Sequence, residues 1–341
     1  MKILGIESSC DDTSISIVDN DKNIIANETL SQNQIHKDYK GVVPELAARN
    51  HVLYIDKILK LILKQNQIRI TDIDLIAATV GPGLIGGLLV GLTFAKTLSQ
   101  VNAIPFIGVN HLEGHALTIR LTNEVEYPFL LLLVSGGHSN FYFISNVNSY
   151  KFLGGTLDDA LGEAFDKVAN ILELGFPGGP QLELLAQAGD YKKISLPKPL
   201  INSKNLDMSF SGLKTAVLNN SKKGKNDISN SDLAASFQKS VAEVLCKKIS
   251  LAIDISNKES FNFKNVVVSG GVAANNYLRK KIINTVKSKG KSIFFPPPNL
   301  CTDNGAMIAW AGYELYRAGL KSKLNMKAKP RWPLENVRER L

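Results

Sequence analysis

The stretch KILGIESSCDDTSISIVDNDKNIIANETL, residues 2–30, predicts three consecutive β-strands. Residues 2–7 and 13–19 are rich in apolar and β-branched side chains, the small-residue turn SSCDD joins them, and residues 23–30 follow a second turn. An amphipathic helix over residues 44–65, PELAARNHVLYIDKILKLILKQ, comes next. The N-terminal part of the chain is therefore expected to form a strand–strand–strand–helix unit.

The same order of elements returns from residue 129. FLLLLVSGGHSNFYFISNVNSYKFLGG, residues 129–155, again predicts three strands, with the turn SGGH after the first, and an amphipathic helix is expected over residues 157–174. Duplication of one unit predicts an α/β fold of two related lobes that face each other across a cleft. Small residues let backbone N–H groups approach a phosphate, so we expect one turn from each lobe to hold a phosphorylated ligand.

Size and composition are those expected of a cytoplasmic protein. The chain has 341 residues, and its most apolar run, residues 129–134, is too short to span a membrane. No signal peptide precedes the first strand, and Cys10, Cys246 and Cys301 show no pair spacing, which favours a reducing compartment. A net charge of +9 allows a polyanionic partner, although the Lys-rich segment 219–230 is also typical of a solvated surface.

A first glycine-rich element spans Gly81, Gly83 and Gly86 and matches the dinucleotide fingerprint G-x-G-x-x-G. The fingerprint also requires an acid at the end of the next strand, but PFIGVN ends in Asn110 without one. No Lys–Ser/Thr pair follows the glycines, which excludes a P-loop. We therefore interpret these glycines as a tight strand-to-helix turn with close helix packing.

A second glycine-rich element, NVVVSGGVAANN at residues 265–276, predicts a buried strand that turns into a helix at Gly270 and Gly271. This arrangement offers free N–H groups and the positive end of a helix to an anion or a purine. Asn275 is expected one turn into that helix, where its amide can bind a ligand.

The helix expected over residues 157–174 carries a polar stripe of Asp159, Glu163, Asp166 and Asn170. Such a stripe is usually a solvated face. The adjacent loop FPGGP, residues 176–180, makes one of these carboxylates a candidate for binding a ribose diol.

The motif NHLEGH, residues 110–115, places His111 and His115 on one face of a helix capped by Asn110, with Cβ atoms roughly 5–6 Å apart. Such a pair can belong to a zinc protease, can simply pack, or can be half of a metal site. Proteases of this type place the glutamate next to one histidine, whereas Glu113 lies midway and points away from the metal face. We expect Glu113 on the helix surface or at a partner contact.

Asp303, in PPPNLCTDNGAMIAWAGYEL, is the best candidate for a third metal ligand; it can also be read as the cap of the following helix, a role that does not exclude metal binding. Two histidines and one carboxylate leave coordination positions open for phosphate or water and suit non-haem iron or zinc.

Together, GIESSCDDT, HLEGH, LVSGGHS, DDALGEAFDK, FPGGP, SFSGLKTA, VSGGVAANN and CTDNGAMIAWAG resemble the tRNA N6-adenosine threonylcarbamoyltransferase family of the bacterial TsaD type. The resemblance covers nearly the whole chain; among the departures from the family pattern are Lys40 in place of a glycine and Met208 in place of a phenylalanine. It implies an actin-like (ASKHA) fold of two duplicated lobes around a nucleotide cleft, with residues 1–115 and roughly 305–341 in one lobe and 116–304 in the other. The implied activity transfers a threonylcarbamoyl group from threonylcarbamoyl-AMP to the N6 amine of the adenosine 3′ of the anticodon in tRNAs that read ANN codons.

The resemblance also implies roles for individual residues. The metal ligands would be His111, His115 and Asp303, with Fe²⁺ the first choice and Zn²⁺ the alternative. The ligand-binding residues would be Leu133, Val134, Ser135, Gly136 and Gly137 for the adenylate, Asp166 for the ribose, Gly179 for the nucleoside and Asn275 for the nucleotide. Asp11 and Glu7 are our candidates for electrostatic catalytic roles. The implied partners are tRNA, a paralogous actin-like subunit and a small ATPase, with no membrane.

Three alternatives make different predictions. A small-molecule carbamoyl transferase on the same fold needs no tRNA and usually carries extra domains, a non-enzymatic partner paralogue lacks the histidine pair and Asp303, and a metalloprotease conflicts with the position of Glu113. The basic tail, residues 321–340, surrounds Trp332 with Lys and Arg, so it either contacts RNA phosphates or is a plain solvated terminus.

Overall fold

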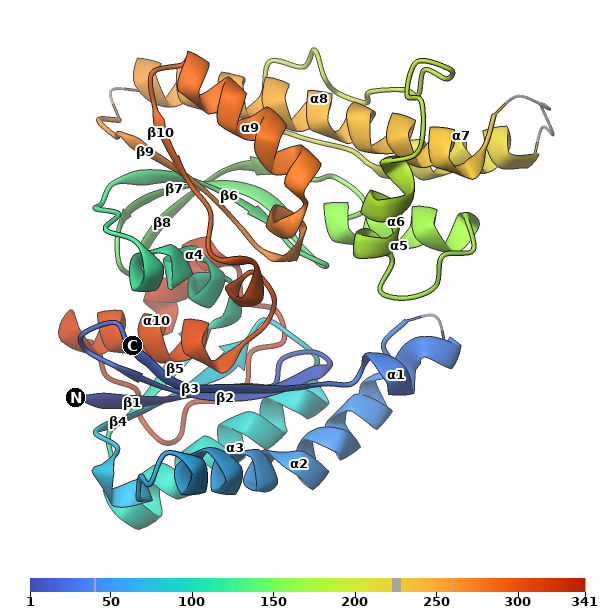
Figure 1. The fold of residues 1–341 in the computed structure, drawn as a ribbon. Helices are drawn as coiled ribbons and strands as arrows, with labels where there is room; N and C mark the ends of the chain where they lie inside the picture. Colours follow the sequence, from blue (N-terminus) through green and yellow to red (C-terminus); the bar gives the residue numbers. More distant parts are fainter. Residues whose placement is uncertain (40, 223–227, 260, 341) are drawn as a thin grey trace. The chain divides into compact units, whose positions relative to one another are not determined.

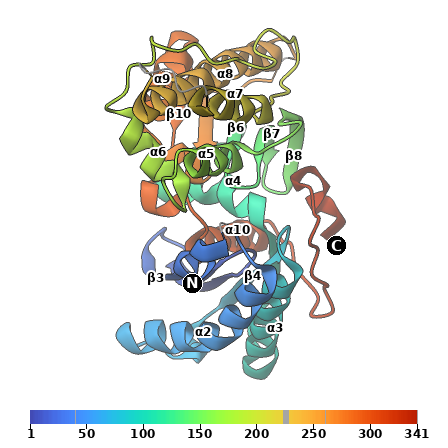
Figure 2. The same cartoon turned by 90° about the vertical axis from the view of Figure 1, so that its right-hand side faces the viewer.

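The computed structural model describes residues 1–39, 41–222, 228–259 and 261–340, which form two compact α/β units (Figures 1 and 2). Lys40 and the centre of the Lys-rich segment, 223–227, lie outside the described residues. Unit 1 comprises Met1–Glu124, Asn146–Tyr150 and Thr302–Leu341, and unit 2 comprises Val125–Ser145 and Lys151–Cys301.

Each unit contains one five-stranded mixed sheet. The strands of unit 1 are β1 (Lys2–Glu7), β2 (Asp12–Asp19), β3 (Ile24–Ser31), β4 (Leu75–Gly81) and β5 (Phe106–Asn110), in the order β3-β2-β1-β4-β5. Those of the second sheet are β6 (Phe129–Val134), β7 (Ser139–Asn146), β8 (Ser149–Gly155), β9 (Asn265–Ser269) and β10 (Ser292–Phe294), in the order β10-β9-β6-β7-β8. Read from the β8 edge, the second sheet has the same strand order as the first sheet. β1 is antiparallel to β2 and parallel to β4, and β6 is likewise antiparallel to β7 and parallel to β9. The predicted duplication is confirmed.

The helices pack against the apolar faces of these two sheets. They are α1 (Asn33–His36), α2 (Pro44–Gln65), α3 (Ile85–Asn102), α4 (His111–Thr122), α5 (Leu161–Ile171), α6 (Gly178–Ala186), α7 (Ser211–Lys222), α8 (Asn230–Lys258), α9 (Asn276–Ser288) and α10 (Gly305–Arg317). In unit 1, α4 and α10 lie on one side of the sheet and α2 and α3 on the other (Figure 1). Every residue of β4 is buried because both faces of its sheet are covered. In unit 2, β6 and β7 pack against α5 and α8 in a core that includes Phe141, Phe165, Phe237 and Met208.

Two predicted helix starts are corrected by the structure. The helix expected from residue 157 begins at Leu161, because the Asp158 carboxylate accepts hydrogen bonds from the Phe210 N–H and the Ser209 hydroxyl and keeps this segment in a loop. Asp159 therefore precedes the helix. After Gly270, whose φ is 96°, a 3₁₀ turn intervenes, so Asn275 is the N-cap of α9 rather than a residue inside it.

The interpretation of Gly83 and Gly86 as packing glycines is confirmed. A Cβ on Gly86 would lie 2.8 Å from Cβ of Ala48 on α2, and one on Gly83 would lie 2.5 Å from the Ser9 carbonyl oxygen. These glycines therefore allow α2 and α3, and the turn after β1, to approach closely.

The basic tail is docked on unit 1, so the interpretation of it as a plain solvated terminus is wrong at Trp332, whereas contact of its Lys and Arg side chains with RNA phosphates stays a prediction. This side chain is 2% exposed, and the Lys329 ammonium lies 4.6 Å from its ring centroid. Backbone hydrogen bonds join Lys329 to Val80 and Pro330 to Gly83, and they hold the segment along the end of β4.

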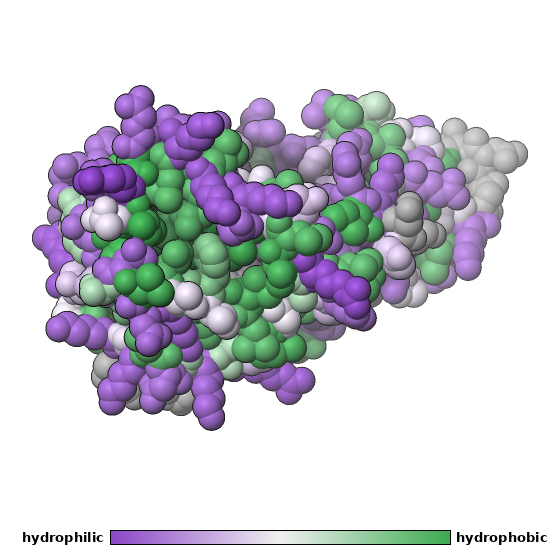
Figure 3. Space-filling view, turned by 90° about the horizontal axis from the view of Figure 1, so that it is seen from below, coloured by the Kyte–Doolittle hydropathy of each residue, from purple (hydrophilic) through white to green (hydrophobic). Residues whose placement is uncertain are grey.

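The outer side of α2 and α3 carries apolar side chains, which gather in the middle of the face shown in Figure 3. The exposed apolar residues on these two helices are Val52, Leu53, Leu61, Ile85, Leu89 and Val101, and we call them the α2–α3 face. Among the described helices, none is both long enough and apolar enough to cross a membrane.

A pair of glycines brings α10 directly onto β1. A Cβ on Gly5 would lie 2.1 Å from the Gly305 carbonyl oxygen and 2.5 Å from the Ala309 nitrogen. The Gly305 N–H also donates to the Ser14 hydroxyl, at 2.9 Å. This contact fixes the start of α10 and, two residues earlier, the position of Asp303.

We expect Gly5→Ala to lower the free energy of unfolding by about 1–3 kcal/mol or more, because the added methyl overlaps backbone atoms that cannot rotate away. The measurement is chemical denaturation followed by circular dichroism. Gly212→Ala is the matched control: its Cβ would meet only the Pro199 ring, at 3.7 Å, and we expect it to be neutral or stabilising by up to about 1 kcal/mol. Equal losses for both variants would contradict the close β1–α10 contact.

Candidate metal centre

The two histidines of NHLEGH lie on α4 as predicted. Strand β5 ends at Asn110, whose side-chain oxygen accepts the N–H of Leu112 at 2.9 Å and caps the helix. His111 and His115 are one helical turn apart, and their ring centroids are separated by 4.8 Å. The local sequence thus fixes both imidazoles on one side of α4.

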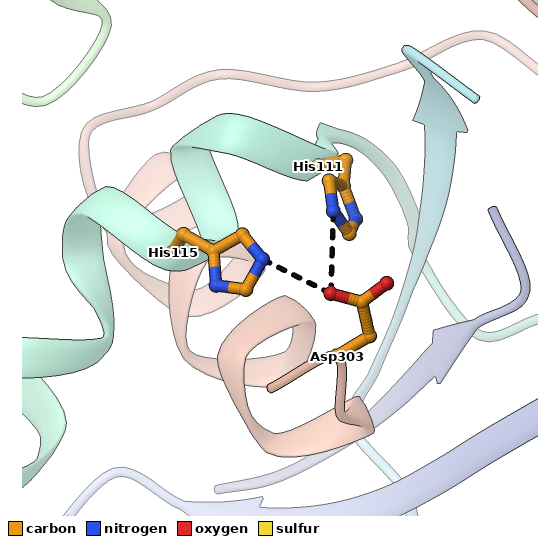
Figure 4. Close-up of side chains that lie close together, drawn as sticks. All are labelled: His111, His115 and Asp303. Carbon is orange, nitrogen blue, oxygen red and sulfur yellow. Dashed lines mark hydrogen bonds and ion pairs between the residues drawn. The ribbon is translucent and has the colours of Figure 1, made fainter. Parts of the chain in front are cut away.

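Asp303 approaches both histidines from the loop before α10 (Figure 4). Its Oδ1 lies 3.1 Å from Nε2 of His115 and 3.5 Å from Nε2 of His111. The cap of α10 is instead Asn304, whose side-chain oxygen accepts the Met307 N–H. The helix-cap interpretation of Asp303 is therefore wrong, and the structure brings the three predicted ligands together.

The geometry of the three side chains suits one small cation. One ligand atom from each residue lies within 4.8 Å of the others. Metal bonds of roughly 2.1 Å at 90–109° separate neighbouring ligand atoms by about 3.0–3.4 Å, close to both distances from Asp303. His111 and His115 are buried, whereas the Asp303 side chain is 25% exposed, so the cluster is accessible from the aspartate side.

Glu7 orients one of these histidines. Its Oε2 lies 3.0 Å from Nδ1 of His111, and its carboxylate also accepts the Thr79 hydroxyl and the Ser9 N–H. A proton on Nδ1 satisfies Glu7 and leaves the Nε2 lone pair for a metal, the usual arrangement around a metal-bound histidine. Glu7 is completely buried, and its contacts suit this positioning of His111; the electrostatic roles of Glu7 and Asp11 stay predictions.

The site carries more negative charge than its histidines balance. Burial alone lowers the pKa of His111, but the carboxylates of Asp303 and Glu7 outweigh burial and raise it to about 9. For Asp12, burial and the charges of Asp303 and Asp11 raise the pKa to about 7. Burial raises the pKa of Glu7, but the neighbouring His111 outweighs it and keeps the pKa below its ordinary value. Such a concentration of carboxylates around two imidazoles favours a bound cation.

The residues predicted to bind the nucleotide all lie in unit 2. The side chains of Leu133 and Val134 are fully buried, so only their backbone can face a ligand. The turn that follows is more open: Gly136 and Gly137 are exposed, with no described atom within 4 Å of an added Cβ. The neighbouring turn after β9 lies against it, because a Cβ on Gly270 would come 2.4 Å from the Val134 carbonyl oxygen.

The structure also shows the surroundings of the other three residues predicted to bind the nucleotide. Asp166 accepts the N–H of Gly178 at 2.8 Å, which places its carboxylate on the FPGGP loop, and Gly179 has open space around it among the described atoms. Asn275 caps α9 by accepting the N–H of Leu278, and its side-chain amide donates to Gln238 at 2.9 Å.

The sequence did not predict the supporting roles of Ser9, Thr79 and Gln238, since no local motif marks a residue that supports another one far along the chain.

The structure corrects the predicted position of Glu113. It was expected on the helix surface or at a partner contact, but it is completely buried and accepts the Tyr150 hydroxyl at 2.7 Å. The reason is the environment of α4, in which ten of the twelve residues are buried. The consecutive buried residues occupy all faces of the helix, which the spacing of its polar residues does not reveal.

Comparison with known proteins gives one consistent result. The family model described as TsaD, tRNA N6-adenosine threonylcarbamoyltransferase, matches residues 23–310. The chain belongs to this family. A tRNA N6-adenosine threonylcarbamoyltransferase of Rickettsia bellii (strain OSU 85-389) is 54% identical over 339 residues, covering 98% of this chain and 99% of the relative. One of Rickettsia rickettsii (strain Sheila Smith) is 53% identical over 341 residues, or 99% of each chain. Family membership makes the chain a transferase of tRNA modification.

Solved structures of low sequence identity share the fold. T. kodakarensis HypF superposes with a TM-score of 0.61 at 15% identity, covering 93% of this chain and 48% of HypF. The activator of 2-hydroxyisocaproyl-CoA dehydratase from Clostridium difficile gives a TM-score of 0.52 at 15% identity, covering 95% of this chain and 99% of that protein. These similarities concern the fold alone, and they agree with the predicted actin-like architecture.

The raised pKa of His111 predicts how the stability of the metal-free protein depends on pH. The folded chain holds this proton up to about pH 9, whereas an unfolded histidine releases it near pH 6.5. The stabilisation is complete below pH 6.5 and is lost as the pH rises to 9, with a slope of up to about 1.4 kcal/mol per pH unit for one proton. Urea unfolding in the presence of a chelator at pH 6.5, 7.5 and 8.5 measures this slope.

The control is the double variant His111→Asn/Glu7→Gln, which removes both coupled groups and should give a flatter profile. Identical slopes for the double variant and the wild type would show that this pair does not titrate in the stated window.

Proposed function

We propose that the chain transfers the threonylcarbamoyl group of threonylcarbamoyl-AMP to the N6 amine of the adenosine 3′ of the anticodon in tRNAs that read ANN codons. The observation that carries this proposal is the cluster of His111, His115 and Asp303 in a chain of the threonylcarbamoyltransferase family. A non-catalytic partner of this fold has no need of these side chains. The net charge of +9 is compatible with a tRNA substrate.

We propose that these three side chains hold one divalent metal ion, Fe²⁺ or Zn²⁺. Two imidazole nitrogens and one carboxylate oxygen suit either ion and leave coordination positions for a ligand. When bound, the ion supplies a Lewis acid and a fixed positive charge for oxygen atoms of the acyl-adenylate. Glu7 keeps the His111 ring in the orientation that makes Nε2 available.

The reaction forms a bond between the N6 nitrogen and the carbamoyl carbon and breaks the bond from that carbon to the phosphate-linked oxygen. AMP leaves with the electron pair of the broken bond, and the amine loses a proton. Because AMP is a competent leaving group, the protein contributes mainly positioning and charge stabilisation. We assign electrostatic stabilisation to Asp11, whose charge, like that of Asp303, raises the pKa of Asp12.

We assign recognition of the AMP portion to residues of unit 2. Gly136, Gly137 and Gly179 have open space in which a ligand can approach their backbone. Leu133 and Val134 at the end of β6, with Ser135 after them, contribute the backbone that leads into the Gly136–Gly137 turn. Asp166 is the candidate for the ribose diol, and Asn275 that for the nucleotide.

His111→Ala should lose metal binding and reduce transfer by at least about a hundredfold, since it removes one of three ligands. The assay combines the protein and the proposed partner proteins with labelled threonylcarbamoyl-AMP and unmodified tRNA. His36→Asn, at a buried histidine of α1, is the control and should retain both properties. Undiminished product with His111→Ala would contradict the metal proposal, and carbamoyl transfer that needs no tRNA would favour the small-molecule alternative.

We further propose that a paralogous actin-like subunit and a small ATPase assist this reaction in the cytoplasm. The α2–α3 face supports a docking surface for the paralogous subunit, because its apolar side chains lie on two adjacent helices and can meet a similar helix pair.

Leu53→Glu/Leu89→Glu should prevent complex formation with the paralogous subunit, because it places two charges on the α2–α3 face. Sedimentation of the mixed proteins measures the complex. Leu184→Glu, at an exposed leucine of α6 in unit 2, is the control and should bind normally. A complex that survives the double substitution would place the partner elsewhere.

A further inference from the structure

Both metal-binding histidines project from the same side of α4 (Figure 4), so the exact setting of this helix decides where their nitrogens lie. Glu113 lies midway between them in the sequence, and its side chain is buried in the protein. The Tyr150 hydroxyl donates to Oε1 of Glu113 at 2.7 Å, and Tyr150 is itself only 7% exposed. A buried hydrogen bond therefore holds α4 between its two metal-binding residues.

The hydroxyl of Tyr150 is oriented by its own surroundings. It accepts the backbone N–H of Asn148 at 3.1 Å, which directs its proton to Glu113. Arg338, in the C-terminal 3₁₀ segment Leu334–Arg340, donates to the Ser149 hydroxyl at 2.8 Å and to the Asn148 carbonyl at 3.3 Å. Arg338 thus holds the two residues that precede Tyr150 at the start of β8, and Asn146–Tyr150 belongs to unit 1.

Trp332, just before this C-terminal segment in the part of the chain coloured dark red in Figure 2, also holds the first turn of α4. Asn110 caps the helix with its side-chain oxygen and donates its amide N–H to the Trp332 carbonyl at 2.9 Å. Both residues are buried. Two separate contacts, one at the cap and one at Glu113, therefore connect α4 to segments that contain no metal ligand.

Removal of the tyrosine hydroxyl has a predictable consequence. A buried carboxylate that loses one of its donors is less well solvated, at a cost of about 1–3 kcal/mol or more, and the chain relaxes to reduce that cost. Glu113 is two residues from each histidine, so any rotation of α4 that relieves the carboxylate moves both imidazoles relative to Asp303.

We propose that Glu113 and Tyr150 are positioning residues of the metal centre, whose hydrogen bond sets the rotation of α4 and thereby the presentation of His111 and His115 to the metal. This inference rests on the proposed metal site and adds two residues that touch neither metal nor substrate. It gives the glutamate of HLEGH a role that differs from that of a protease base.

The test is titration of the metal-stripped full-length protein with Co²⁺, followed by its visible d–d absorption. Tyr150→Phe should raise the Kd for Co²⁺ about threefold to tenfold, less than the 10–100-fold typical of residues that contact a ligand directly, and should shift the absorption band. Tyr142→Phe is the matched control, because it removes another buried tyrosine hydroxyl, one that accepts from Asn140 on β7. It should lower stability without changing the Kd or the spectrum.

Two substitutions of Glu113 complete the test. Glu113→Gln keeps an oxygen that can accept the tyrosine proton and should restore Co²⁺ binding to within about twofold of the wild type, whereas Glu113→Leu should behave like Tyr150→Phe. If Glu113→Leu does not fold, the Kd values of Tyr150→Phe and Glu113→Gln for Co²⁺ still decide whether the hydrogen bond positions the metal ligands.

The outcomes separate this inference from the proposed function. If wild type and His111→Ala bind Co²⁺ equally, the metal site itself is wrong. If the wild type binds Co²⁺ and Tyr150→Phe shows the same Kd and spectrum while losing only stability, the metal site stands and the positioning role is overturned.

Discussion

The convergence of Asp303 on the two imidazoles of α4 is the interaction around which unit 1 is organised. It joins residues 188 positions apart, and it requires α10 to start in direct backbone contact with β1, where Gly5 and Gly305 leave no room for a side chain. Glu7, at the end of the same strand, reaches His111 from the other side. Several carboxylates and two imidazoles in a buried place are stable only with a compensating positive charge, which the metal-free protein meets by holding a proton on His111.

Much of the fold follows from local sequence patterns. The strands of residues 2–30 and 129–155 are predicted because alternating and β-branched runs separated by small-residue turns are local signals, and their repetition reveals the duplicated architecture. The start of α5 was misplaced because the Asp158 carboxylate is bound by a segment some fifty residues later in the chain. The burial of Trp332 was not predicted for the same reason: its carbonyl accepts from Asn110 at the end of β5, and the preceding Lys329 and Pro330 pair with Val80 and Gly83, all distant in sequence.

In the candidate site, too, local features could be predicted from the sequence and contacts between distant residues could not. The spacing of His111 and His115 is local, so one helical turn suffices to pair them, and the offset of Glu113 excludes the protease mechanism. Asp303 was only one candidate until the geometry removed its interpretation as a helix cap. Neither the contact of Glu7 with His111 nor that of Glu113 with Tyr150 has a signature in the sequence, because each depends on which elements the tertiary fold brings together.

The central claim is that a metal held by His111, His115 and Asp303 is required for transfer of the threonylcarbamoyl group. The most direct measurement is single-turnover transfer from threonylcarbamoyl-AMP to tRNA by the wild-type protein, before and after removal of its metal and after re-addition of Fe²⁺ or Zn²⁺. We predict that the stripped protein forms no product and that one equivalent of the correct ion restores the original rate. Transfer at an unchanged rate by protein shown to contain no metal would contradict the claim.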